Sequence, residues 1–96
     1  MEIESISHKA LKRFFITGNS KGLTGDVERL RAMLALIAAA TSLHDLARPP
    51  NYGLHRLTGN RVGTWSMTIT RNWRLTFNVT PAGAVADMNL EDYHGS

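Results

Sequence analysis

The chain has 96 residues, 43% hydrophobic and 20% charged, which fits one globular domain over residues 1–96 and excludes a fibrous repeat or a wholly disordered chain. It contains no cysteine, which excludes disulfide bonds, thiolate zinc sites and cysteine nucleophiles. No apolar run approaches the roughly 18 residues of a membrane span, and the N-terminus lacks a secretory pattern. We therefore expect a cytoplasmic protein without a membrane partner.

The first predicted elements are a short strand and a helix. Residues 2–6 alternate between polar and apolar side chains, which predicts an edge strand. A helix is expected over residues 8–17, with Ser7 as its N-cap and Gly18 at its end. Its apolar side comprises Leu11, Phe14 and Phe15.

A second, longer helix is predicted over residues 25–40, with Thr24 as its N-cap. A stripe at helical spacing, which should face the core, consists of Val27, Leu30, Leu34 and Ile37. Both helices are interpreted as scaffold rather than as carriers of chemistry. A further short turn is expected over residues 42–46.

The period then changes to two, which predicts strands. Residues 64–70 and 73–80 alternate strictly, and Arg71-Asn72 between them has the length of a hairpin turn. Further strands are expected over residues 84–90 and 52–57. The predicted fold class is α+β: two N-terminal helices packed on a twisted, mainly antiparallel sheet.

Basic residues gather in one part of the chain. The net charge is only +3, but no acidic residue lies between Asp45 and Asp87. This stretch carries His55 and five arginines, which are Arg48, Arg56, Arg61, Arg71 and Arg74. Guanidinium groups match phosphate oxygens in bidentate fashion, so the stretch is suited to a partner that carries phosphate groups. A solvated basic face that only maintains solubility is the alternative.

Alternation assigns these residues to a face of the sheet. The side toward the helices should hold Trp65, Met67, Ile69, Trp73, Leu75 and Phe77. The opposite face should then present Arg74, Thr76 and Asn78, with Arg61 and Arg71 in the connections beside it. Such a face can hold a phosphate backbone, although the open face of any antiparallel sheet is polar.

Two histidines are candidates for proton transfer. His55 precedes a glycine-containing loop, and His94 closes the run Asp92-Tyr93-His94 after the last strand. A carboxylate, a phenol and an imidazole can supply a base, a hydrogen-bond donor and an acid. The alternative is a polar tail without a role. His8 and His44 are interpreted as surface or capping residues.

Several motifs resemble one family over almost the whole chain. They are the opening run at residues 8–15, the segment at 52–66, the N-W-R-L-T-F strand at 72–77 and the closing E-D-Y-H at 91–94. Together they resemble the HigB-type killer proteins of bacterial toxin–antitoxin systems, within the RelE-like superfamily.

The resemblance implies a ribonuclease that cuts messenger RNA in the ribosomal A site. It implies attack of the ribose 2′-hydroxyl on the adjacent phosphate, with neither a metal ion nor a cofactor. The implied partners are the ribosome, messenger RNA and a HigA-type helix-turn-helix antitoxin, through which alone the protein would contact DNA. The implied catalytic residues are His55, Arg71, Arg74, Asp92, Tyr93 and His94, and we assign RNA binding to Arg56, Arg61, Thr76 and Asn78.

The chain departs from the family pattern around residue 58. Relatives commonly have a lysine where this chain has Thr58, so that phosphate contact is lost or has moved to Arg56. Asn60 replaces an aspartate, and Gly95-Ser96 follow the usual D-Y-H terminus, as a cloning remnant would. Two other functions stay open: a non-catalytic module that binds RNA or the ribosome, and a corepressor that acts through its antitoxin.

Overall fold

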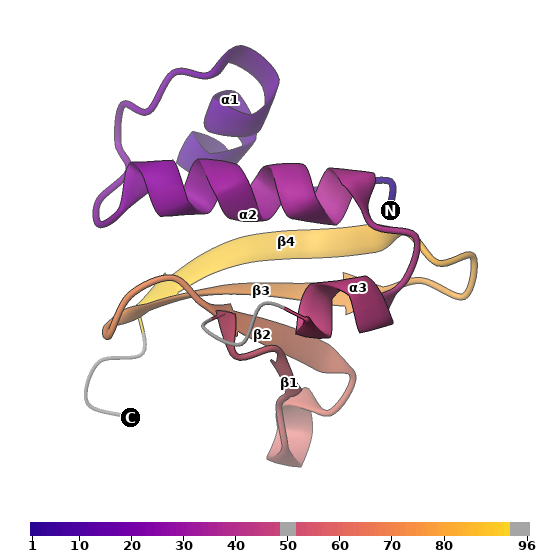
Figure 1. Cartoon of the computed structure of the whole chain (residues 1–96). Helices are drawn as coiled ribbons and strands as arrows, with labels where there is room; N and C mark the ends of the chain where they lie inside the picture. The colour runs from indigo at the N-terminus through magenta and orange to yellow at the C-terminus, as the bar shows by residue number, and fades with distance from the viewer. Residues whose placement is uncertain (49–51, 93–96) are drawn as a thin grey trace.

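The computed structural model describes residues 1–48 and 52–92, which form three helices and one four-stranded sheet. The helices lie on one side of the sheet (Figure 1). They are α1 (Lys9–Thr17), α2 (Val27–Ala39) and α3 (Leu43–Ala47). The strands are β1 (His55–Arg56), β2 (Thr64–Thr68), β3 (Trp73–Val79) and β4 (Val85–Asp92). They are antiparallel in the order β1-β2-β3-β4, which confirms the predicted α+β class.

The helix caps differ from the predicted ones. His8 caps α1, because its Nδ1 accepts a hydrogen bond from the amide of Leu11 at 3.1 Å. The hydroxyl of Ser7, predicted as this cap, instead donates to the carbonyl of Met88. Gly18 ends the helix as predicted, with φ of 79°, a conformation that glycine adopts at little cost. Helix α2 begins later than expected, because Asp26 rather than Thr24 is its cap.

The N-terminal segment pairs with the edge of the sheet in two isolated bridges rather than as a continuous strand. Ile3 pairs with Val85 and Ile6 with Met88, both in parallel orientation. The interruption coincides with Asp87, whose φ of 53° is unusual for a residue other than glycine. An edge position for residues 2–6 is therefore confirmed, whereas an uninterrupted strand is not.

Strands β1, β2 and β3 are shorter than the sequence predicts, whereas β4, with eight residues ending at Asp92, is longer than the predicted strand over residues 84–90. Strand β1 has two residues instead of six, and β2 ends at Thr68 instead of residue 70. The turn between β2 and β3 thus spans residues 69–72, in which the amides of Ile69 and Thr70 both donate to the carbonyl of Trp73. Residues 59–61, expected as part of a loop, form a 3-10 turn, η2 (Gly59–Arg61).

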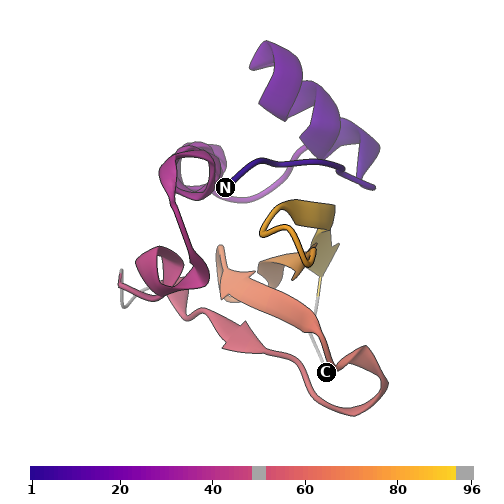
Figure 2. The same ribbon diagram turned by 90° about the vertical axis from the view of Figure 1, so that its right-hand side faces the viewer.

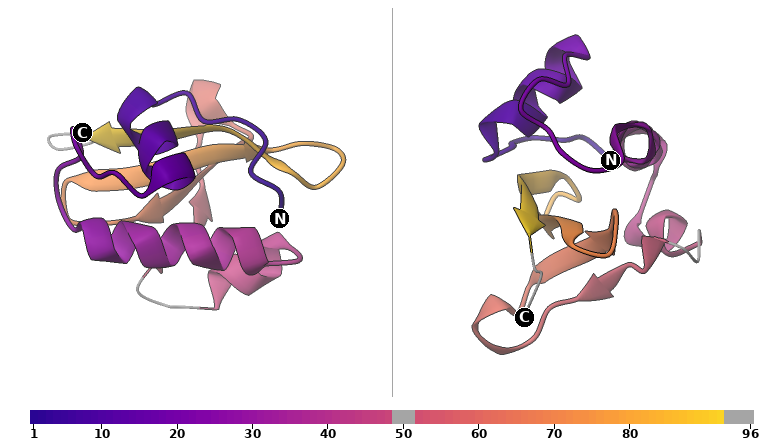
Figure 3. Two further views of the ribbon diagram at one scale, coloured as in Figure 1. Left: turned by 90° about the horizontal axis from the view of Figure 1, so that it is seen from above. Right: turned by 90° about the vertical axis from the view of Figure 1, so that its left-hand side faces the viewer.

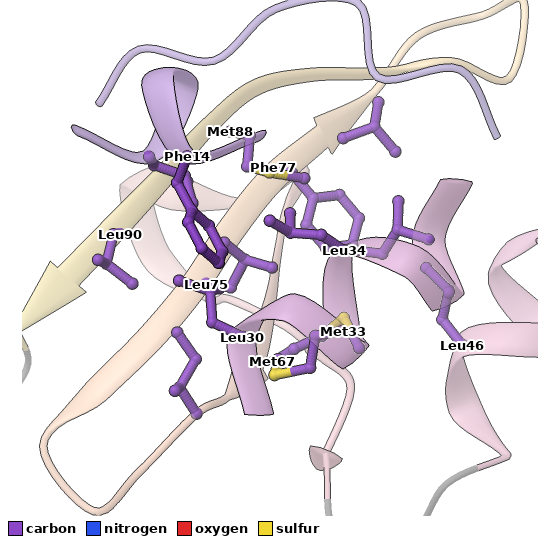
Figure 4. Close-up of a cluster of buried hydrophobic side chains, with 14 of the residues drawn as sticks. Phe14, Leu30, Met33, Leu34, Leu46, Met67, Leu75, Phe77, Met88 and Leu90 are labelled. Atoms are coloured by element: carbon purple, nitrogen blue, oxygen red, sulfur yellow. The ribbon is translucent and has the colours of Figure 1, made fainter. Parts of the chain in front are cut away.

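The core lies between the helices and one side of the sheet (Figure 4). Met67, Leu75 and Phe77 are fully buried on this side, as the alternation predicts. From α1 and α2 the buried side chains are Leu11, Phe14, Leu30, Met33, Leu34 and Ile37, of which Met33 is absent from the predicted stripe. Trp65 and Trp73 are half-buried at the margin of the core.

The remaining views show how the layers meet. Helix α2 runs along the sheet rather than across it (Figure 3). The connection between β1 and β2 curves away from the helices, on the far side of the sheet (Figure 2). Within the described part of the chain, no helix is long and apolar enough to cross a membrane.

Candidate functional site

The face of the sheet opposite the helices, here called the polar face, is organised in rows by the strand register. One row contains His55, Ser66 and Thr76, because Ser66 pairs with both of the others. The next row contains Thr68, Arg74 and Glu91. Residues in a row, and the neighbouring rows of one face, lie close enough for long side chains to interact. His55 and Arg74, predicted as catalytic, therefore share one face in adjacent rows.

A single carboxylate organises this face. Glu91 accepts hydrogen bonds from both ends of the Arg61 guanidinium, Nη1 to Oε1 at 2.7 Å and Nη2 to Oε2 at 2.6 Å. It also accepts one from Arg74 Nη2 at 3.3 Å and one from the Thr76 hydroxyl at 2.5 Å. We call Arg61, Arg74, Thr76 and Glu91 the arginine cluster.

The contacts within the cluster shift the pKa values of its charged groups. Hydrogen bonds from Arg61 lower the pKa of Glu91 from 4.5 to about 2, with smaller contributions from Thr76 and Arg74, while burial opposes the shift. The same hydrogen bond raises the pKa of Arg61. Glu91 is therefore ionised at neutral pH, and the two arginines and one glutamate together carry one net positive charge.

Arg61 and Glu91 come from distant parts of the chain. Arg61 is the last residue of η2, between β1 and β2, whereas Glu91 lies on β4, beyond β2 and β3. The connection between β1 and β2 curves to the side of the sheet that faces away from the helices, and from there Arg61 pairs with Glu91 (Figure 2). On the same face Ser66 and Thr76 are only 1% and 2% exposed.

The expectation of an open polar face is therefore corrected at its centre. Thr76, predicted to bind RNA, is buried, and its hydroxyl donates a hydrogen bond to Glu91 instead of facing solvent. Ser66 is equally buried, and its hydroxyl has no hydrogen-bond partner in the described part of the chain. Alternation gives the side of a residue but not what covers it.

His55 is exposed beside the cluster and is held by a local contact. Its Nδ1 lies 2.8 Å from the carbonyl oxygen of Gly53. Because a carbonyl can only accept, Nδ1 carries the proton, and the neutral ring has its lone pair on Nε2. Gly53 has φ of 57°, and a side chain there would contact Thr68 at 3.4 Å.

The other predicted catalytic residues are distributed over one end of the sheet. Arg71 is exposed in the turn between β2 and β3, and Arg74 is mostly buried, with a side chain 20% exposed. Asp92 is exposed opposite Trp73, so alternation directs it to the other side of β4 from Glu91. Tyr93 and His94 lie outside the described residues.

Two of the predicted RNA-binding residues lie apart from the arginine cluster. Arg56 is exposed, with its guanidinium carbon 5.6 Å from the ring centroid of Trp65. Asn78 joins a separate network, in which its side-chain oxygen accepts from Thr64 at 3.1 Å and its nitrogen donates to Asp87 at 3.1 Å.

Sequence reasoning missed Glu91 as a site residue, although it lies within the closing motif. Alternation would have placed Glu91 on the polar face, because on the last strand it directly follows the apolar Leu90 and precedes Asp92. Its pairing with Arg74 required the register between β3 and β4, which the sequence does not fix. Among the described residues no group of three or more metal-ligating side chains occurs.

Comparison with known proteins identifies close relatives. Residues 4–94 match the family model of HigB-like toxins, described as the RelE-like toxin of the type II toxin–antitoxin system HigB. The chain is 42% identical over 93 residues to the endoribonuclease HigB of Proteus vulgaris, covering 96% of this chain and 99% of that protein.

Solved structures agree on the fold. YafQ from E. coli strain BL21(DE3) superposes with a TM-score of 0.65 at 18% identity, covering 96% of this chain and 92% of YafQ. A chain of the E. coli DinJ-YafQ toxin–antitoxin complex gives a TM-score of 0.55 at 17% identity, with 92% and 91% of the two chains covered. At these identities the likeness establishes a shared architecture.

Proposed function

Because the chain belongs to the HigB family of RelE-like toxins from type II toxin–antitoxin systems, we propose that it is an endoribonuclease that cleaves translated messenger RNA in the ribosomal A site. The near full-length identity to a protein named endoribonuclease HigB supports the activity. The observation that carries the site is the placement of His55, Arg61 and Arg74, from three different segments, on one face of the sheet. Cleavage of translated messengers implies a cytoplasmic location.

The proposed reaction is an internal transesterification. The ribose 2′-oxygen attacks the adjacent phosphorus, the bond from phosphorus to the 5′-oxygen breaks, and the products are a 2′,3′-cyclic phosphate and a 5′-hydroxyl. One group must accept the 2′-hydroxyl proton, and another must protonate the leaving oxygen. Cationic donors must stabilise the charge that develops on the non-bridging oxygens.

His55 is our candidate for the base. Its Nδ1 donates to Gly53, so the lone pair on Nε2 is available to accept the 2′-hydroxyl proton. We assign the protonation of the 5′-oxygen to His94, with Asp92 orienting that imidazole and Tyr93 stacking on a base or donating a hydrogen bond. Tyr93 and His94 take these roles from their sequence motif alone.

The arginines supply the positive charge. Arg71 is exposed in the turn between β2 and β3, and Arg74 lies on the polar face one row from His55. Both are assigned to the transition-state charge, while Arg61 and Arg56 grip the RNA backbone. Membership of a toxin–antitoxin family supports a helix-turn-helix antitoxin as the neutralising partner.

Primer extension on a messenger in a purified translation reaction tests the proposal. The samples are the unchanged chain, His55→Ala, His94→Ala and a reaction without ribosomes. His44→Ala is the matched control, because His44 is an exposed histidine on α3. We expect cuts in register with codons that require ribosomes, are retained by His44→Ala, and fall by about a hundredfold or more in the other two variants.

Two other outcomes would contradict parts of the proposed function. If the folded chain binds ribosomes but makes no cuts, the nuclease assignment is wrong and the polar face is a docking surface. Cuts that persist unchanged in both His55→Ala and His94→Ala would leave the endoribonuclease assignment standing but remove these histidines from its mechanism.

A further inference from the structure

Glu91 is the one acidic group within the arginine cluster. Its side chain is 18% exposed, and its two oxygens accept all four hydrogen bonds that Arg61, Arg74 and Thr76 donate within the cluster. An acidic group beside a site for a phosphate would by itself weaken binding, since it repels the ligand. Its presence therefore requires a different explanation from attraction to RNA.

The geometry supplies that explanation. Arg61 and Glu91 meet in a bidentate pair, which fixes the plane of the guanidinium as well as its position. The same carboxylate accepts a hydrogen bond from Arg74. The Thr76 hydroxyl also donates to this carboxylate and so helps to fix its position. Arg61 uses two of its five N–H donors in this pair, which leaves three to face another anion.

We propose that Glu91 is a positioning residue that orients Arg74 toward the scissile phosphodiester and Arg61 toward the RNA backbone beside it, and that it cancels one of their two charges, so that the pair presents a single positive charge to the RNA. This inference rests on the proposed function. Glu91 does not touch the reacting atoms. The negative charge of Glu91 weakens binding of the RNA ground state. In return, the fixed guanidinium donors make the reaction faster.

Glu91→Gln tests this, because glutamine keeps the length of the side chain and removes its charge. Two quantities are measured: the salt-dependent Kd for a short single-stranded RNA with 2′-O-methyl riboses, which cannot be cleaved, and the single-turnover cleavage rate on programmed ribosomes. The matched control is Glu28→Gln, which makes the same charge change on α2, where the Glu28 side chain is 82% exposed.

We expect Glu91→Gln to bind RNA about three- to tenfold more tightly at low salt, and log Kd to change more steeply with log salt by about 0.7. Its cleavage rate should fall by about a hundredfold, since displaced donors no longer match the transition state. Glu28→Gln should change neither quantity appreciably. A purely structural role for Glu91 would instead weaken binding and cleavage together.

A second variant keeps the test informative if Glu91→Gln fails to fold. Arg61→Lys retains the positive charge but cannot form the bidentate pair with Glu91. It should bind the modified RNA within about twofold of the unchanged chain and cleave at least tenfold more slowly.

Three results would overturn the inference: an unchanged cleavage rate in Glu91→Gln, weaker RNA binding by that variant, or an unchanged rate in Arg61→Lys. If the unchanged chain cleaves nothing on ribosomes, the proposed function fails. The binding series then decides the role of Glu91, because an absence of tightening in Glu91→Gln contradicts it.

Discussion

Glu91 also gives the fold a specific sensitivity to acid. Its pKa is about 2 in the folded chain, against an ordinary value of 4.5. Because the folded-state value is the lower one, the carboxylate stabilises the fold fully above pH 4.5, and this contribution is lost as the pH falls from 4.5 toward 2. The difference between the two pKa values corresponds to about 3 kcal/mol.

We therefore expect the stability advantage of the unchanged chain over Glu91→Gln to shrink by about 2–3 kcal/mol between pH 7 and pH 2. Urea unfolding at several pH values measures it. Glu28→Gln is the reference, since a surface carboxylate that is 82% exposed contributes little to stability at any pH. Parallel acid profiles for the unchanged chain and Glu91→Gln would show that the carboxylate is not stabilised in the fold.

At the same scale, the residue types of the site could be predicted from the sequence, but their connections could not. His55, Arg61 and Arg74 were identified as candidates, and the register brings His55 and Arg74 to one face. The pairing of Arg61 with Glu91 joins residues 30 positions apart through a curved connection. No local pattern encodes such a contact. Alternation could place Glu91 on the polar face, but neither its pairing with Arg61 nor the burial of Thr76 could be foreseen.

At the scale of single elements, helix α2 shows that the sequence predicts a buried helix face more reliably than a helix end. The stripe of α2 was predicted correctly at Leu30, Leu34 and Ile37, because a period of 3.6 marks a buried face. The first residue of the helix was misplaced, because Thr24 and Asp26 are both residue types that cap helices and the sequence does not fix which of them does so.

The caps of α2 can be distinguished by experiment. Asp26 Oδ1 accepts a hydrogen bond from the amide of Arg29 at 2.9 Å, and its charge lies at the positive end of the helix dipole. Asp26→Ala should therefore lower the free energy of unfolding by about 1 kcal/mol. Thr24→Ala, an equally small change two residues earlier, should stay within about 0.5 kcal/mol of the unchanged chain. Urea unfolding compares them, and an equal loss in both variants would contradict this cap assignment.

The whole molecule divides its two tasks between the two sides of one sheet. The apolar side packs against α1 and α2 and contains the core (Figure 4). The polar face holds the arginine cluster, whose contacts are hydrogen bonds and ion pairs. Stability and chemistry therefore depend on different side chains of the same strands, and alternation keeps them apart.

This separation predicts that stability can be lowered without changing the site. Met33 on α2 is fully buried, so Met33→Ala should cost about 2–5 kcal/mol through lost contacts and a cavity. Ile16→Ala, on α1 at a residue 66% exposed, should cost less than about 1 kcal/mol. Urea unfolding measures both losses.

Cleavage assayed where both variants remain folded should proceed at the rate of the unchanged chain, because neither residue belongs to the polar face. A rate that falls in Met33→Ala, although the protein is folded, would mean that the core transmits strain through the sheet. The arginine cluster would then depend on the packing beneath it. In that case Arg61→Lys and Met33→Ala together should lose less than the sum of their separate effects, since both would act on the same geometry.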